Sequence, residues 1–336
     1  MKLLIAVHHP FDLWVPPPWF ARRLQREFPE VEVAQTYAYE EAERRLAEVE
    51  VMIGWSLRPE QFARARRLRW IHSTAAAVHG LLHAGIIASD VVITNASSVH
   101  GAVVAEHALA MLLALARRLP SASRYQAQRM WAQQELWRER PQPREVSGAV
   151  LGLIGVGAIG AEIARRALAF GMLIRAVRLH PEQGVNFLPA GTLNPAAVTV
   201  MGLDRVDDAV KEADFLVLAA PLTPATGRLI DSARLQRMKP EAYLINVSRG
   251  ALVDEAALAE ALRAGRLGGA ALDVFEEEPL SPDSPLWDLP GVLISPHAGS
   301  MTDKLWERNY ALLAENLRRY LQGRPLLQVV DKRSGY

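Results

Sequence analysis

The stretch between residues 150 and 179 constrains the fold more than any other part of the chain. An apolar run at 150–154 predicts a short strand, the glycines of GVGAIG follow, residues 161–170 have the pattern of a helix, and a second strand begins near Leu173. Strand, glycine turn, helix and strand form one βαβ unit. In such a unit the first glycine permits a tight turn, the second lets the backbone approach a pyrophosphate, and the third lets the helix pack closely on the strand.

This unit predicts a dinucleotide-binding site, because the positive end of the helix dipole faces the turn. The residues expected to contact the dinucleotide are Gly155, Gly157, Ala158, Ile159 and Gly160. An Asp or Glu at the end of the second strand would bind the ribose 2′-hydroxyl of NAD, whereas an Arg accommodates the 2′-phosphate of NADP. Residues 174–180 contain no carboxylate, and Arg178 stands where one is expected. The sequence favours NADP(H), with NAD(H) possible; the alternative is that Arg178 is a solvated charge at a strand end.

Composition excludes several classes of function. The chain has 336 residues, 50% of them hydrophobic, which predicts about two domains with sizeable cores. Its formal net charge is +1 with both signs interspersed, so neither nucleic acid nor an anionic membrane is expected as a partner. Cysteine is absent, and the histidines lack metal-ligand spacing, so no metal site is expected. We expect no signal sequence, because the apolar run at residues 1–7 is too short for one and lacks a cleavage site, and no apolar run approaches the roughly 18 residues of a membrane span. We therefore expect a cytoplasmic protein.

Strands alternate with helices along most of the chain, which predicts doubly wound parallel sheets in an α/β protein. Before residue 95 we expect strands at 3–7, 31–34, 51–55, 70–73 and 91–95, and helices at 19–28, 40–49 and 59–68. The loop from Ser73 to His79 follows the fourth strand, at an edge where such sheets bind ligands, and its backbone N–H groups could bind a small anion. It could equally be an ordinary connection.

A long helix at 101–118 precedes a polar segment at 119–147, which we interpret as an arm or linker. Its Trp131 and Trp137 pack either on their own domain or at a subunit interface. Residues 181–200 are expected to be irregular. The remaining expected elements are helices at 206–212, 255–264 and 303–321, and strands at 215–219, 244–247, 269–274 and 294–297.

Three ionisable residues follow expected strand ends, namely Arg249, Glu278 and His297. Each alone would usually be a solvated or structural group, but together they match what the reduction of a 2-keto acid requires. Histidine has a pKa suited to protonating the carbonyl oxygen near neutral pH, and a neighbouring carboxylate orients the ring. A guanidinium can bind the substrate carboxylate and polarise the carbonyl.

Several further motifs are recognisable along the chain: PLTPAT at 221–226, the segment from MKP at 238–240 to NVSRG at 246–250, ALDVFEEEP at 271–279, SPHAG at 295–299, and TN at 94–95 with VAEH at 104–107. They resemble those of the D-isomer-specific 2-hydroxyacid dehydrogenase family, with its glyoxylate and hydroxypyruvate reductases. The resemblance implies a Rossmann cofactor domain, residues 98–298, inserted in a flavodoxin-like substrate-binding domain, residues 1–97 and 299–336. It also implies a homodimer to which residues 119–147 contribute.

The resemblance assigns a role to individual residues. Arg249 would bind substrate, His297 would be the acid and base, and Glu278, directly before Pro279, would be its partner. Asp273 would contact the nicotinamide carboxamide. Pro221 and Thr226 would line the cofactor cleft, and the backbone N–H groups of Ala76 and Ala77 would meet the substrate carboxylate.

The chain departs from the family pattern in two places. Ala75, Ala77 and His79 replace the usual glycines and Asp of the substrate loop, and a Gly-to-Ala change preserves the backbone donors only where φ stays negative. The segment at 181–200 is also longer than is usual. We predict an NADP(H)-preferring reductase of small 2-keto acids, such as glyoxylate or hydroxypyruvate. The alternatives are an NAD-dependent phosphoglycerate dehydrogenase-like enzyme and a nucleotide-sensing, corepressor-like binding protein.

Overall fold

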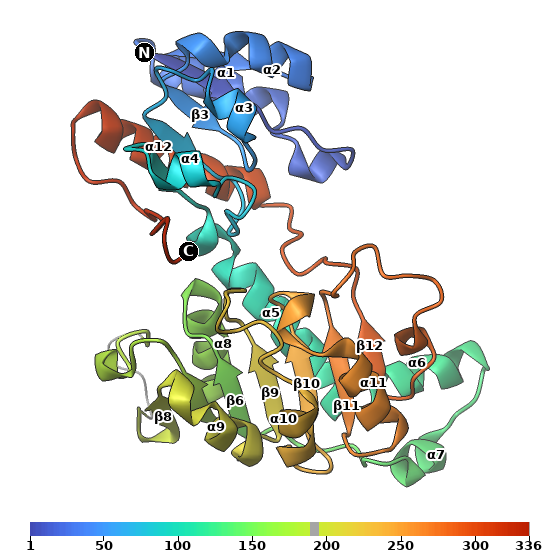
Figure 1. Cartoon of the computed structure of the whole chain (residues 1–336). Helices are drawn as coiled ribbons and strands as arrows, with labels where there is room; N and C mark the ends of the chain where they lie inside the picture. Colours follow the sequence, from blue (N-terminus) through green and yellow to red (C-terminus); the bar gives the residue numbers. More distant parts are fainter. Residues whose placement is uncertain (189–194, 336) are drawn as a thin grey trace. The chain divides into compact units, whose positions relative to one another are not determined.

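All the strands that the structure describes belong to two parallel sheets (Figure 1). The structure is a computed structural model that describes residues 1–188 and 195–335. The chain divides into two compact units: unit 1 comprises residues 1–100 and 301–336, and unit 2 comprises residues 101–300. The expectation of an α/β protein with two doubly wound parallel sheets is confirmed.

Unit 1 contains a five-stranded parallel sheet of order β2-β1-β3-β4-β5. This is the flavodoxin-like order, in which the order of successive strands across the sheet reverses beside β1. Its strands are β1 (Lys2–Ile5), β2 (Glu32–Gln35), β3 (Val51–Ile53), β4 (Trp70–His72) and β5 (Val92–Thr94). Its helices are α1 (Pro18–Glu27), α2 (Tyr39–Arg45), α3 (Pro59–Phe62), α4 (Ala84–Ile87) and the C-terminal α12 (Leu305–Leu321).

Alternation along the strands gives the sheet of unit 1 two buried faces. Leu3 and Ile5 of β1 belong to one apolar cluster with residues of α1 and α12, whereas Leu4 belongs to a second cluster on the other face. Successive side chains of a strand point to opposite faces, so a strand that is apolar at every position must be covered on both sides. The expected return of the last helix to the first sheet is therefore what completes one face of unit 1.

Unit 2 contains a seven-stranded parallel sheet of order β12-β11-β10-β9-β6-β7-β8. The order reverses beside β6, as in dinucleotide-binding folds. Its strands are β6 (Val150–Ile154), β7 (Leu173–Val177), β8 (Val198–Met201), β9 (Phe215–Leu218), β10 (Tyr243–Asn246), β11 (Gly269–Leu272) and β12 (Val292–Ile294). Its helices are α5 (Ser97–Ala116, which begins in unit 1), α6 (Leu119–Ala127), α7 (Gln133–Arg138), α8 (Ala158–Ala169), α9 (Val206–Glu212), α10 (Ser232–Arg237) and α11 (Glu255–Arg263).

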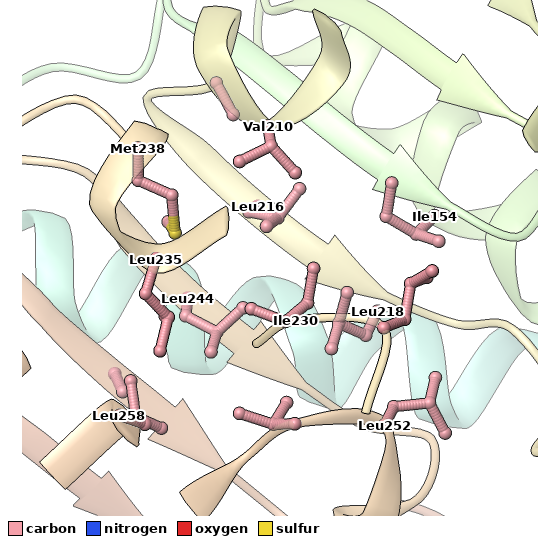
Figure 2. Packing of buried hydrophobic residues seen from close by; sticks show 14 of the residues in the cluster. Ile154, Val210, Leu216, Leu218, Ile230, Leu235, Met238, Leu244, Leu252 and Leu258 are labelled. Carbon is pink, nitrogen blue, oxygen red and sulfur yellow. The ribbon is translucent and has the colours of Figure 1, made fainter. Parts of the chain in front are cut away.

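The second sheet is also buried on both faces. Leu216 and Leu218 of β9 pack with side chains of α9, α10 and α11 in one cluster (Figure 2). Phe215 and Val217 of the same strand belong to the opposite cluster, with residues of α5 and α8. Burial on both faces fixes the register of the strands, because a shift of one residue would move the side chains of a strand to the opposite face. The sheet is therefore a rigid support.

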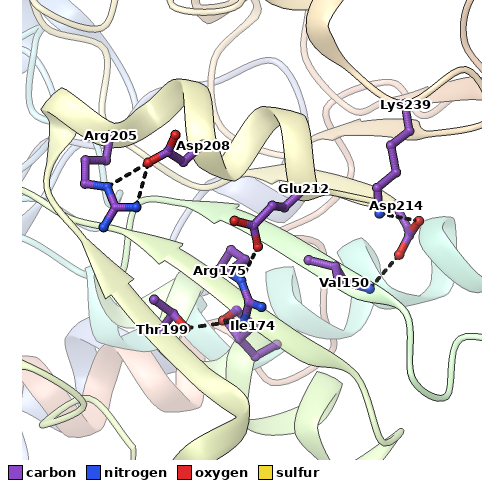
Figure 3. A network of polar contacts seen from close by, with 9 residues as sticks. All are labelled: Val150, Ile174, Arg175, Thr199, Arg205, Asp208, Glu212, Asp214 and Lys239. Atoms are coloured by element: carbon purple, nitrogen blue, oxygen red, sulfur yellow. Dashed lines mark hydrogen bonds and ion pairs between the residues drawn. The ribbon is translucent and has the colours of Figure 1, made fainter.

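Asp214 fixes the start of the strand that leads to the glycine turn. Its Oδ2 accepts a hydrogen bond from the Val150 N–H at 2.8 Å, and its Oδ1 lies 3.0 Å from Lys239 Nζ (Figure 3). Burial acts to raise the pKa of Asp214, but the hydrogen bonds from Val150 and Lys239 and the charge of Arg144 outweigh it and lower the pKa. Asp214 therefore remains a charged anchor for β6 at neutral pH.

The expected arm at 119–147 contains two helices, α6 and α7, which the polar composition of the segment concealed. The expected helix at 59–68 ends at Phe62. The chain continues in tight turns, such as the hydrogen bond from the Ala65 N–H to the Phe62 carbonyl, which bury Ala65 and Leu68. The short helix α10 was not predicted. In all three segments local turns and tertiary burial decided the structure rather than periodicity.

The segment expected to be irregular contains β8 at its end, an edge strand that pairs with β7. Residues 189–194 of that segment lie outside the described residues. The helix α5 is long and apolar enough to cross a membrane by length and composition alone, which corrects the expectation that no such stretch exists. However, 61% of its most apolar window is buried, and residues such as Leu109 and Leu112 belong to the core of unit 2. This burial is typical of a core helix.

Candidate active site

The glycine turn after β6 has the geometry that its three glycines require. Gly155 has a φ of +95°, and a Cβ there would lie 2.6 Å from the backbone nitrogen of Ala220. A Cβ on Gly160 would lie 2.1 Å from the carbonyl oxygen of Gly155, so only glycine lets α8 pack this closely on the turn. A Cβ on Gly157, in contrast, would have no atom within 4 Å. The turn is therefore tight at its two ends and open at its centre.

The open centre lies at the N-terminus of α8. Gly157 is the N-cap of this 12-residue helix and provides no side-chain acceptor for the N–H groups of the first turn, which belong to Ala158, Ile159 and Gly160. An anion placed there would meet both these donors and the positive end of the helix dipole. The geometry fits a phosphate group of a dinucleotide.

Arg178 lies at the same edge of the sheet as the glycine turn. It directly follows β7, and the carbonyl oxygen of Val177, the last residue of β7, accepts a hydrogen bond from the Gly155 N–H at 2.9 Å. The Arg178 guanidinium is half-buried and donates to the Asn186 Oδ1 at 2.7 Å and the Gln183 Oε1 at 2.5 Å. It is thus an ordered cation rather than a freely solvated one.

The turn after β9 lies on the other side of the glycine turn. Ala220, which is next to Gly155, leads into Pro221, and the buried hydroxyl of Thr226 donates to the Pro221 carbonyl oxygen at 2.7 Å. The same hydroxyl accepts the Thr223 N–H at 2.8 Å. Thr226 therefore closes this turn from within, and Pro221 is the exposed residue of the pair.

Arg249 is held by a tight turn after β10. The Asn246 side chain donates to the Arg249 carbonyl oxygen at 2.9 Å and accepts the Ser248 N–H at 3.1 Å. The next residue must be glycine, because a Cβ on Gly250 would lie 1.8 Å from the backbone of Phe275. Burial lowers the pKa of Arg249, and the negative charge of Glu278 opposes that shift. Arg249 and Glu278 are therefore within electrostatic reach of each other.

His297 and Glu278 are in direct contact. The Nδ1 atom of His297 lies 2.7 Å from Oε2 of Glu278, whose Oε1 accepts the Phe275 N–H at 3.0 Å. The carboxylate is therefore held on one side by the backbone and faces the imidazole with the other. The His297 side chain is 48% exposed, so its other ring nitrogen can reach a ligand from solvent.

Asp273 is buried next to this pair. It is 2% exposed, and its two carboxylate oxygens accept the N–H groups of Ala298 at 2.8 Å and Gly299 at 2.9 Å. Its Oδ1 also lies 3.3 Å from Nε2 of His107, close enough for an ion pair, although the contact does not have the geometry of a hydrogen bond. Burial acts to raise the pKa of Asp273, but these polar neighbours outweigh it and lower the pKa.

Two residues that support this site were not predicted. Asn246 orders the turn of Arg249, and Glu255, at the start of α11, accepts the Glu276 N–H through its Oε1. Burial raises the pKa of Glu255, and the charges of Glu276 and Glu278 raise it further. The bonds of Asn246 stay within its own turn, whereas the bond of Glu255 joins two distant segments, for which the sequence carries no local signal.

The loop from Ser73 to His79 belongs to unit 1. Ala76 and Ala77 are half-buried, and none of the alanines at 75–77 has a positive φ. The Ala75 carbonyl accepts the Ala96 N–H at 3.1 Å, and the Ala76 carbonyl accepts from the Asn95 side chain at 3.0 Å. With both carbonyls held in this way, the loop is ordered, and the condition under which alanine preserves the backbone donors is met.

Comparison with known proteins gives a consistent result. Residues 109–299 match the family model described as the NAD-binding domain of D-isomer-specific 2-hydroxyacid dehydrogenases. The chain is 32% identical to a D-3-phosphoglycerate dehydrogenase of Methanocaldococcus jannaschii over 93% of its own length and 57% of that protein. It therefore spans little more than half of that relative. It is 35% identical to a glyoxylate reductase of Korarchaeum cryptofilum, over 79% of this chain and 76% of that one.

Solved structures of the same architecture cover both chains almost completely. A D-isomer-specific 2-hydroxyacid dehydrogenase family protein of Aeromonas salmonicida has a TM-score of 0.80 and 31% identity, over 98% of this chain and 99% of that one. An NADPH-dependent glyoxylate/hydroxypyruvate reductase of Sinorhizobium meliloti, in complex with NADP and sulfate, has a TM-score of 0.78 and 26% identity, over 100% and 99%.

Proposed function

Since this chain belongs to the D-isomer-specific 2-hydroxyacid dehydrogenase family, we propose that it is an oxidoreductase that interconverts a small 2-keto acid and the D-2-hydroxy acid with NADP(H). The substrate class is that of glyoxylate and hydroxypyruvate. The observation that carries this proposal is the contact between His297 Nδ1 and Glu278 Oε2 at 2.7 Å, in the same unit as Arg249. An ordered acid–base pair next to a cation is what a carbonyl reduction requires.

In this proposal His297 donates a proton to the carbonyl oxygen in reduction and accepts it in oxidation. The Glu278 carboxylate stabilises the protonated ring and fixes its orientation through Nδ1, which leaves Nε2 for the substrate. Arg249 binds the substrate carboxylate, because a guanidinium forms directional, charge-assisted hydrogen bonds with it.

The nicotinamide cofactor, when bound, supplies or accepts the hydride at the substrate carbon. Gly155, Gly157, Ala158, Ile159 and Gly160 would hold its pyrophosphate, and Arg178 its 2′-phosphate. Pro221 and Thr226 would line the cleft, and Asp273 would meet the carboxamide. The open space at Gly157 supports binding of a dinucleotide, and the absence of a carboxylate from residues 174–180 supports NADP(H) as the preferred form, with NAD(H) possible.

The substrate carboxylate would also meet the N–H groups of Ala76 and Ala77, which makes residues 1–97 and 299–336 the substrate-binding domain and residues 98–298 the cofactor domain. The negative φ of these alanines supports that assignment. Trp131, between α6 and α7, is 93% exposed, and Trp137, on α7, is 61% exposed; large exposed aromatics in this segment support a homodimer built with it. We place the protein in the cytoplasm. A monomer by light scattering would contradict the dimer.

The test is an initial-rate assay by nicotinamide absorbance. NADPH and NADH are each offered with glyoxylate, hydroxypyruvate, pyruvate and bulkier 2-keto acids. Fast turnover with NADPH is expected, and Arg178→Asp is expected to shift the preference toward NADH. Because one curated relative is a phosphoglycerate dehydrogenase, 3-phosphoglycerate is tested in the oxidative direction. Turnover of 3-phosphoglycerate with NAD, without turnover of the 2-keto acids, would contradict the proposed substrate class.

A further inference from the structure

The guanidinium of Arg178 is surrounded by neutral acceptors. It donates to Asn186 Oδ1 at 2.7 Å, to Gln183 Oε1 at 2.5 Å and to the Gly184 carbonyl oxygen at 3.3 Å. Its Cζ lies 5.7 Å from the centroid of the Phe187 ring. These residues form one short segment, 183–187, and each partner that the structure describes for this guanidinium is uncharged. The orientation of Arg178 is thus fixed without any loss of its positive charge.

Other arginines of unit 2 are paired with a carboxylate, which neutralises their charge. Arg175, three residues earlier in β7, is bound by the Glu212 carboxylate at 2.5 Å, and Arg205 is bound by the Asp208 carboxylate at 2.7 Å (Figure 3). A carboxylate neutralises a guanidinium and weakens its attraction for a second anion. Near Arg178 the one acidic side chain of the 181–187 segment, Glu182, is 3.2 Å from His180 Nδ1 instead.

We infer that Gln183 and Asn186 determine the cofactor specificity of this chain, because they orient the Arg178 guanidinium toward a 2′-phosphate while leaving its charge uncompensated. The inference rests on the proposed use of NADP(H). Fixing a flexible arginine before the ligand arrives removes part of the entropy cost of binding. Each carboxamide also retains an NH2 group, which can itself donate to a phosphate oxygen.

The same contacts have an opposite interpretation, in which segment 183–187 competes with the phosphate for the guanidinium. The two interpretations differ in the sign of one effect. If Asn186 orients Arg178, its removal weakens binding of a 2′-phosphate, whereas if Asn186 competes, its removal strengthens binding.

The experiment measures binding of 2′,5′-ADP and 5′-AMP by calorimetry, together with kcat/KM for NADPH and NADH. The variants are Asn186→Asp, Gln183→Glu and Asn186→Ala. The control is Gln236→Glu, which makes the same amide-to-carboxylate change on the exposed face of α10, where the side chain contacts Ser232. Thermal unfolding of each variant shows whether it is folded.

We expect the unaltered chain to bind 2′,5′-ADP more tightly than 5′-AMP. Asn186→Asp and Gln183→Glu should weaken 2′,5′-ADP about tenfold or more, since a like charge then faces the phosphate, and should leave 5′-AMP unchanged. Asn186→Ala should weaken 2′,5′-ADP by a smaller factor, and Gln236→Glu should change nothing. Unchanged binding in Asn186→Asp, or tighter binding in Asn186→Ala, would overturn the inference.

The binding assay separates this inference from the proposed function. If no acid is turned over but Asn186→Asp still abolishes the preference for 2′,5′-ADP, the reaction is wrong and the inference stands. If turnover is fast but the NADPH-to-NADH ratio is the same in Asn186→Asp, the reaction stands and the inference is wrong. Equal binding of 2′,5′-ADP and 5′-AMP by the unaltered chain would refute both the role of Arg178 and that of its two partners.

Discussion

The backbone N–H of His297 donates a hydrogen bond to the carbonyl oxygen of Asp273 at 2.8 Å. The carboxylate of Asp273 then accepts the next two N–H groups, those of Ala298 and Gly299. His297 has a φ of +51°, a left-handed conformation that costs a non-glycine residue about 1–2 kcal/mol. A Cβ on Gly299 would lie 2.7 Å from Asp273 Oδ2, so this clamp also explains the glycine. Asp273 therefore stabilises the backbone conformation that presents the imidazole to Glu278.

Asp273→Asn should lower kcat. The amide nitrogen of Asn cannot accept a hydrogen bond, so one of the N–H groups at 298 and 299 loses its partner. Loss of a hydrogen bond to a charged group costs about 1.5–3 kcal/mol, which corresponds to roughly a tenfold to hundredfold fall if the cost appears in the placement of His297. The measurement is kcat and KM with NADPH and the best 2-keto acid of the rate assay. The control is Asp231→Asn at the N-cap of α10, which removes a negative charge but keeps one oxygen that can still accept the Arg234 N–H. An equal fall in kcat in both variants would show that the second acceptor of Asp273 does not place His297.

Glu278→Gln should lower kcat by about a hundredfold or more, within the range of general acid–base catalysis. A glutamine has one acceptor oxygen, which cannot serve both the Phe275 N–H and the His297 ring. If the oxygen stays with the backbone, an NH2 group faces Nδ1 and disfavours the protonated imidazole. Glu277→Gln is the matched control, since Glu277 is exposed and adjacent. Turnover of Glu278→Gln at the rate of Glu277→Gln would exclude Glu278 as the partner of His297.

The sequence predicted the fold because the fold depends on patterns within short segments. Apolar strands such as Phe215–Leu218 and the spacing of Gly155, Gly157 and Gly160 are local signals, and both sheets agree with them. The edge strand β8 was missed because it follows a segment rich in Pro and Gly, which indicated an irregular structure. Local pattern therefore accounts for the apolar strands, at the edges β2 and β5 as well as in the centre, but not for β8.

Some features of the candidate site also follow from local sequence, and others do not. Arg249, Glu278 and His297 could be selected as residues that follow strands, and their catalytic roles remain predictions. The left-handed backbone of His297 and the partners of Arg178 depend on contacts that no periodicity encodes. These contacts are made by backbone groups and neutral amides, whose identity says little about where they will lie.

Gly157→Ala should separate cofactor binding from folding. A Cβ at Gly157 meets no atom within 4 Å, and its φ of −87° is open to alanine, so the thermal unfolding temperature should change little. The methyl group would occupy the space above the first turn of α8, where we place the pyrophosphate, and should weaken NADPH at least about tenfold because it prevents close approach of the backbone. Gly160→Ala is the contrasting variant, since its Cβ would collide with the Gly155 carbonyl and should destabilise the fold. Unchanged NADPH affinity in a folded Gly157→Ala protein would move the cofactor away from this turn.

The buried His72 should make the stability of unit 1 depend on pH. Its side chain is fully buried, its Nδ1 is hydrogen-bonded to Thr94 Oγ1 at 2.9 Å, and burial lowers its pKa to about 4. In the unfolded chain the imidazole titrates near 6.5. Above that pH both states are neutral at this site and its contribution to stability is complete. As the pH falls from about 6.5 to 4, the unfolded chain binds a proton that the folded chain does not, so stability falls by about 1.4 kcal/mol per pH unit, or roughly 3 kcal/mol in total.

His72→Asn tests this dependence, because the Asn amide can take the place of Nδ1 beside Thr94 and does not titrate. Denaturant unfolding of both proteins between pH 7 and 4.5 gives the free energy of unfolding. The value for the unaltered protein minus that for the variant should fall by about 1.4 kcal/mol per pH unit below pH 6.5, whatever the offset between them at pH 7. Comparing slopes removes the general cost of the substitution, since Asp214, Asp273 and the other groups with a lowered pKa titrate alike in both proteins. Parallel curves would mean that His72 has the same pKa in the folded and the unfolded chain. Burial would then not lower the pKa of this imidazole.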